Sequence, residues 1–96
     1  MASRKETKKD IEFVVGEIIS DCLNYLHLYK GKNEEEVLGL IEVMIRLRDD
    51  LIARVNHIDG KDNATLVKAH FNKIYKDLES KTTEVVEKLS QLVRPS

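Results

Sequence analysis

Residues 45–63, IRLRDDLIARVNHIDGKDN, decide how many helices the chain forms. In their first half, apolar residues recur with the spacing of an amphipathic helix, and in their second half this spacing stops. Asp59-Gly60 is typical of a turn, because glycine readily adopts the left-handed backbone found there. Asp62 or Asn63 then offers a side-chain oxygen that can cap a new helix. The stretch therefore predicts the end of one helix, a short loop and the start of the next.

The apolar periodicity is interrupted a second time at Gly31, so the chain divides into three helices. We expect them over residues 4–29, 34–56 and 63–93. Both connections are short, and short connections make sequential helices antiparallel neighbours. No segment alternates between apolar and polar residues with the period of a strand. The predicted fold is an all-α, up-down-up antiparallel three-helix bundle with a long C-terminal helix, and residues 1–96 form a single domain.

Polar side chains suited to helix caps stand where each helix should begin. Ser3 and Thr7 each precede an acid by three residues, as in a capping box, so either can begin the first helix. Asn33 is the expected N-cap of the second helix, whose first turn contains the acids of residues 34–36. Acids in a first turn complement the positive end of the helix dipole. The acidic run is therefore interpreted as a helix start in preference to a ligand cluster.

Composition limits the classes of function open to the chain. Its 96 residues are 42% hydrophobic and 34% charged, which is typical of a folded globular domain and not of a disordered one. The formal net charge is −1, so no overall positive field attracts nucleic acid or an anionic membrane surface. We expect neither nucleic acid nor membrane as a partner.

The single cysteine, Cys22, has no partner for an intrachain disulfide and cannot build a multi-thiolate metal site. Its solitary occurrence fits a reducing compartment. The N-terminal stretch lacks the apolar run of a secretion signal, and no apolar segment approaches the roughly 20 residues that span a bilayer. We therefore expect a cytoplasmic protein.

Four charged residues of the second helix alternate in sign at four-residue spacing: Glu42, Arg46, Asp50 and Arg54. Such i,i+4 pairs contribute only about 0.2–0.5 kcal/mol each and are typical of a solvated helix face. We expect all four on the outside. At 100° per residue, the apolar stripe opposite them includes Ile41, Met44 and Ile52 and centres near position 48.

Arg48 falls inside that apolar stripe, so it is the most unusual residue of the chain. A buried guanidinium without a partner costs several kcal/mol, and we expect Glu17 or Asp21 of the first helix to bind it. The third helix offers Tyr75 and Asp77 as further partners. Three roles stay open for Arg48: an ion pair that sets the helix register, a contact in a dimer, and part of an anion or substrate pocket.

Catalytic and metal-binding patterns are incomplete. The acidic run beginning at Glu35-Glu36 lacks the third carboxylate that a Glu-Glu-x-x-Glu magnesium site requires. The three histidines lie on different elements, and the loop from His57 to Asn63 lacks the spacing of a calcium-binding loop. We expect no metal, no cofactor and no catalytic residue.

The third helix is long enough to extend beyond its shorter partners, which would expose apolar residues near its C-terminal end. The candidate interface consists of Val85, Val86, Leu89, Leu92 and Val93. These observations predict a small, non-enzymatic interaction or structural protein that self-associates as a homodimer, with an unidentified protein partner also open. The alternative is a small all-α enzyme or anion-binding domain with its pocket around Arg48.

Overall fold

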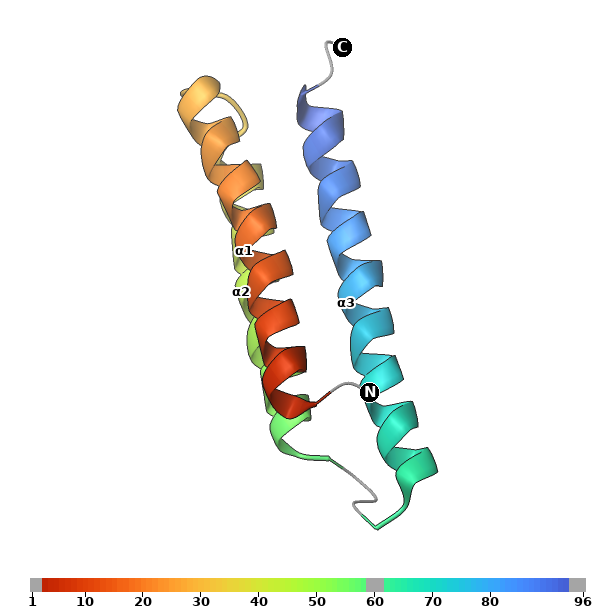
Figure 1. Ribbon diagram of the computed structural model, residues 1–96. Helices are drawn as coiled ribbons and strands as arrows, with labels where there is room; N and C mark the ends of the chain where they lie inside the picture. The colour runs from red at the N-terminus through yellow and green to blue at the C-terminus, as the bar shows by residue number, and fades with distance from the viewer. Residues whose placement is uncertain (1–2, 59–61, 94–96) are drawn as a thin grey trace.

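A computed structural model describes residues 3–58 and 62–93 (Figure 1). The described chain consists of three helices, α1 (Arg4–Leu28), α2 (Glu34–Asn56) and α3 (Ala64–Val93), and contains no strand. Figure 1 shows α1 running up, α2 returning beside it and α3 running up again, within a body of 52 × 20 × 18 Å. The all-α three-helix bundle is confirmed, with each helix end within one residue of its expected position.

Side-chain caps begin α1 and α3. The Oγ atom of Ser3 accepts a hydrogen bond from the backbone N–H of Glu6 at 3.1 Å. The Oδ1 atom of Asn63 accepts from the N–H groups of Thr65 and Leu66, at 3.0 and 3.2 Å. Each oxygen satisfies donors that have no partner within the first turn of a helix. The predicted turn at residues 59–60 lies outside the described residues.

The turn between α1 and α2 differs from its expected form. Asn33 precedes α2 as predicted, but its side chain makes no capping bond and its φ of 55° lies in the left-handed region. Its Nδ2 atom donates instead to the Oη atom of Tyr25 at 2.8 Å, and Tyr25 Oη donates to the carbonyl of Leu92 at 3.4 Å. The carboxylate of Glu34 accepts from Gly31 N–H at 2.8 Å, which closes the turn. This turn therefore links α1, α2 and the end of α3.

The core is concentrated in the hairpin of α1 and α2. Of the fifteen buried hydrophobic residues in the described chain, eleven belong to these two helices and four to α3. The eleven are Ile11, Val15, Ile18, Cys22, Tyr25, Val37, Leu40, Met44, Leu47, Leu51 and Val55. The four from α3 are Phe71, Ile74, Leu78 and Val85. Helix α3 thus lies on a hairpin that already holds most of the buried apolar surface.

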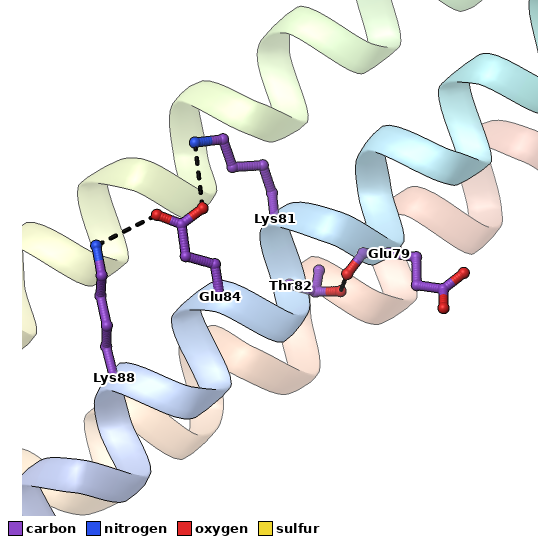
Figure 2. Close-up of polar contacts among 5 residues, drawn as sticks. All are labelled: Glu79, Lys81, Thr82, Glu84 and Lys88. Atoms are coloured by element: carbon purple, nitrogen blue, oxygen red, sulfur yellow. Dashed lines mark hydrogen bonds and ion pairs between the residues drawn. The ribbon is translucent and has the colours of Figure 1, made fainter.

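Between Leu78 and Val85, α3 has no hydrophobic residue to bury. Figure 2 shows charged residues of this stretch and of the helical turn that follows it. Glu84 lies between two lysines, 3.5 Å from Lys81 Nζ and 3.3 Å from Lys88 Nζ. The bond from Lys88, followed by the charge of Lys81, lowers the pKa of the Glu84 carboxyl. The middle of α3 therefore carries exposed ion pairs of its own where a core residue is absent.

The two glycines within helices, Gly16 and Gly39, face open space. A Cβ atom added at either position would meet no atom within 4 Å. Glycine inside a helix costs about 1 kcal/mol against alanine, because it loses more backbone freedom on folding. Neither glycine is required by packing within the chain.

We predict that Gly39→Ala raises the free energy of unfolding by about 0.5–1 kcal/mol, measured by urea denaturation. Gly31→Ala is the matched control, and it should lower stability because Gly31 has a φ of 78° that alanine adopts with strain. A loss of stability in both variants would contradict the open surroundings of Gly39.

Candidate functional site

Arg48 bridges α1 and α2 at the edge of their packing. Its guanidinium lies 2.5 Å from the carboxylate of Glu12 and 3.0 Å from that of Asp49. The side chain is 41% exposed, so it is not enclosed in the core. The expected partners were wrong, because the structure pairs Arg48 with Glu12, whereas Glu17 and Asp21 are exposed elsewhere on α1.

The rotation of α2 explains this error. Its buried residues centre on Met44 and Leu51, roughly 50° around the helix from position 48, where the apolar stripe was expected to centre. The displacement moves Arg48 to the border of the buried face. It also turns Ile45 outward, where 46% of its surface is exposed.

The charge of Arg48 is already balanced by its neighbours. The hydrogen bond to Glu12, followed by the charge of Glu12, raises the pKa of the Arg48 guanidinium, and Asp49 adds to the effect. Two carboxylates therefore already neutralise the positive charge that would attract an anion to this position. The arrangement is suited to holding α1 and α2 in register.

Arg54 does not belong to the solvated face on which it was expected. Its NH1 atom lies 2.8 Å from Asp77 of α3, and its NH2 atom lies 3.3 Å from Asp50. The Nε2 atom of His70, also on α3, lies 2.6 Å from the backbone carbonyl oxygen of Arg54. The sequence concealed this contact, because the i,i+4 pairing of Arg54 with Asp50 by itself accounts for the alternating charges of α2. The other arginine among these four charged residues, Arg46, does form an exposed pair with its i−4 neighbour.

Tyr75 connects α3 with the beginning of α1. Its Oη atom donates to Asp10 Oδ2 at 2.6 Å and lies 3.4 Å from the Oγ1 atom of Thr7. Thr7 is buried within α1. Of the two residues expected to begin this helix, Ser3 does so and Thr7 does not. Burial, followed by the hydrogen bond to Asp10, raises the pKa of the Tyr75 hydroxyl.

Each pair of helices thus has at least one polar contact between side chains, and we call the shortest such contact in each pair a polar tie. The three polar ties are Glu12–Arg48 between α1 and α2, Arg54–Asp77 between α2 and α3, and Asp10–Tyr75 between α1 and α3. All three involve the first half of α1 or of α3, or the second half of α2. Within residues 3–58 and 62–93, no group of three His, Cys, Asp or Glu side chains could hold a metal ion. The polar groups of the ties connect each helix with its two neighbours.

An apolar groove separates α1 from the C-terminal half of α3. It has a volume of about 420 Å³ and is lined by Ile18, Asp21, Val86, Leu89, Ser90 and Val93. Arg48 is not among its lining residues. The groove does include Asp21, one of the expected site residues, at a place remote from the arginine it was expected to bind.

The five α3 residues of the candidate interface separate into two groups. Val85 is buried in the core, and Leu89 and Leu92 pack partly against it. Only Val86 and Val93 are exposed, by 44% and 48%. Val85 must be removed from the candidate interface, because its side chain is already used within the chain.

A second apolar surface follows the line where α1 meets α2, on the side away from α3. We call it the hairpin seam, and its residues are Ile19, Leu23, Leu38, Ile41 and Ile45. Leu23 and Leu38 are each 53% exposed. On the helix wheels these residues lie on the same side of each helix as the Glu12–Arg48 tie, whereas the ties to α3 lie on the opposite sides.

No protein-family model matches the chain, and the comparisons with curated proteins and with solved structures give no significant match. Among the described residues, no helix combines the length and the apolar character that crossing a membrane requires. Function must therefore be inferred from the chain's own surfaces and polar contacts.

We predict that Asp77→Ala lowers the free energy of unfolding by about 1–2 kcal/mol, because Arg54 loses its closer, interhelical carboxylate in a partly buried site. Glu42→Ala is the matched control, since Glu42 is an exposed partner of Arg46 and its loss should cost under about 0.5 kcal/mol. Urea denaturation measures both values. Equal losses in the two variants would contradict a special role for Arg54.

The buried thiol of Cys22 predicts a pH effect on stability. Burial, followed by the charge of Asp21, raises the pKa of this thiol above its ordinary value. The unfolded chain therefore loses the proton first, and this contribution to stability decreases as pH rises past about 8.5. Denaturation at pH 7.5 and 9.5 under reducing conditions should show a smaller loss in Cys22→Ala than in the unmodified chain. Identical losses would contradict this assignment.

Proposed function

We propose that the protein is a small, non-enzymatic helical interaction protein that self-associates and acts in the cytoplasm. The observation that carries this proposal is apolar surface left outside a completed core. Within residues 3–58 and 62–93, ten large hydrophobic side chains are exposed: Phe13, Leu23, Leu28, Tyr29, Leu38, Val43, Ile45, Leu66, Val86 and Val93.

The grouping of these side chains matters more than how many there are, because single exposed hydrophobic residues are common on soluble proteins. Five of the ten belong to the two surfaces described above. Val86 and Val93 line the groove, and Leu23, Leu38 and Ile45 lie in the hairpin seam. Contiguous apolar surfaces rimmed by polar residues are typical of sites where another protein binds.

The charged residues support an interaction protein better than an enzyme. An anion-binding or catalytic site around Arg48 needs a guanidinium available to a ligand, but Glu12 and Asp49 already bind this one. His70 is engaged by the Arg54 carbonyl oxygen. A cytoplasmic location is supported by Cys22, a buried free thiol that needs no oxidised partner.

The test is the mass of the protein in solution over a dilution series. Light scattering from nanomolar to high micromolar concentration should follow a transition from the chain mass of 11.1 kDa to twice that value. A constant monomer mass over the full range would contradict self-association.

A further inference from the structure

We propose that the last part of α3, residues 85–93, is a movable flap that swings away from the α1–α2 hairpin while the first half of α3 stays in place. Residues 79–84 are the hinge of this motion. When the flap opens, it widens the groove between α1 and α3 and uncovers the apolar face of the hairpin beneath it. The motion takes place within one chain, so the proposal is independent of self-association.

The hinge interrupts the apolar packing of α3. Phe71, Leu78 and Val85 lie seven residues apart and are all buried. Helices that pack with this repeat bury a further apolar residue three or four positions into each interval. Ile74 is that residue in the first interval, but in the second interval the half-buried position belongs to Thr82. The apolar contact of α3 with the hairpin is therefore divided into two parts by a polar residue.

The hydroxyl of Thr82 binds its own helix and not the hairpin. Its Oγ1 atom donates to the backbone carbonyl oxygen of Glu79 at 3.0 Å (Figure 2). A threonine hydroxyl that binds a carbonyl one turn earlier competes with the backbone hydrogen bonds there and often bends a helix. None of residues 79–84 is buried. This short stretch is therefore the place where α3 bends most easily.

The first half of α3 is held firmly against the hairpin. Phe71, Ile74 and Leu78 are all buried. Its polar ties to Arg54 and Asp10 have lengths of 2.8 and 2.6 Å. Buried side chains and short polar contacts both have to be lost before this half can leave the hairpin.

The flap is held by less. Val85 is its one buried residue, and Leu89 and Leu92 are only partly buried. Among the described residues, the flap's one hydrogen bond to the hairpin runs from Tyr25 Oη to the Leu92 carbonyl oxygen, at 3.4 Å. This distance exceeds the roughly 2.5–3.0 Å of ordinary hydroxyl hydrogen bonds, so the bond is a weak latch.

The groove further reduces the contact between the flap and α1. Its volume of about 420 Å³ lies beside Val86, Leu89 and Val93 of the flap. Atoms that face open space lose the dispersion contacts that a close-packed interior provides. Segments with few buried apolar contacts open locally at a smaller free-energy cost than global unfolding. The flap has this property, whereas the first half of α3 does not.

The flap covers the buried thiol of the chain. Ile18 lines the groove, and Tyr25 binds the end of the flap. Cys22 lies between these two residues on the same buried stripe of α1 and is fully buried. Opening of the flap therefore exposes this thiol without unfolding the hairpin.

Hydrogen exchange of individual amides, followed by nuclear magnetic resonance, tests the flap directly. After correction for intrinsic rates, the amides of residues 85–91 should exchange with one common protection factor, at least about tenfold smaller than that of residues 71–78. The change between the two values should fall within residues 79–84. Equal protection along all of α3 would overturn the proposal. A gradual decrease toward Val93 without a step would also overturn it, because that is ordinary fraying of a helix end.

Two matched changes separate opening of the flap from global unfolding. Tyr25→Phe and Tyr75→Phe each remove one hydroxyl that joins α1 to α3. The Tyr25 bond is lost in both the open and the unfolded state, so Tyr25→Phe should speed exchange of residues 85–91 and of residues 71–78 by about threefold. The Tyr75 bond survives in the open state, so Tyr75→Phe should speed exchange of residues 71–78 alone. Faster exchange of the flap in Tyr75→Phe, or unchanged exchange of the flap in Tyr25→Phe, would contradict the hinge.

Filling the polar position should close the flap. Thr82→Leu supplies the missing apolar side chain and should slow exchange of residues 85–91 by at least about threefold. Ser80→Leu is the control, because it gives a similar gain in helix propensity at an exposed position of the same stretch, and it should change this rate less than about twofold. Equal effects of the two changes would contradict a hinge at Thr82.

Reaction of Cys22 with 5,5′-dithiobis(2-nitrobenzoate) provides a readout independent of exchange. Its rate should fall in Thr82→Leu by the same factor as the exchange of residues 85–91, because one opening controls both. A thiol reaction that follows the exchange of residues 71–78 instead would show that only global unfolding exposes Cys22 and would overturn the assigned role of the flap.

Discussion

The packing of α1 against α2 is the interaction on which the rest of the structure depends. Ile11 of α1 and Val37, Met44 and Leu51 of α2 are completely buried, and most of the buried hydrophobic residues belong to this hairpin. This packing sets the rotation of α2. The rotation in turn places Arg48 at the edge beside Glu12 and leaves Ile45 facing outward. The ion pair of Arg48 and the exposure of Ile45 both follow from this rotation of α2.

Helix α3 depends on polar contacts to a greater degree than the hairpin does. Its apolar contacts are interrupted between Leu78 and Val85, and its ties to Arg54 and Asp10 come from Asp77 and Tyr75, just before this interruption. At its other end, the Leu92 carbonyl accepts from Tyr25, which is itself bound by the turn before α2. Polar contacts between helices add modest stability but penalise alternative registers. They can therefore fix where α3 lies along a hairpin that offers it limited apolar contact.

Sequence reasoning predicted the helices well, because caps and periodicity are local properties. Ser3 and Asn63 begin α1 and α3 through bonds to residues no more than three positions away. The rotation of α2 could not be predicted in the same way. Ile45 is as hydrophobic as a core residue, so a helix wheel includes it in the buried stripe and draws Arg48 inward with it. The partner of Arg54 on α3 lies 23 residues away, and only tertiary packing brings it near.

This combination of a hydrophobic residue outside and an arginine at the border has a common explanation if α2 packs against two surfaces, one within the chain and one in a second copy. The most direct test is an isotope-filtered nuclear Overhauser experiment on an equal mixture of labelled and unlabelled chains, which detects contacts between copies only. The account predicts intermolecular signals from the methyl protons of Ile45, which is 46% exposed in the single chain. Intermolecular signals from the methyl groups of Val86 and Val93, with none from Ile45, would contradict it.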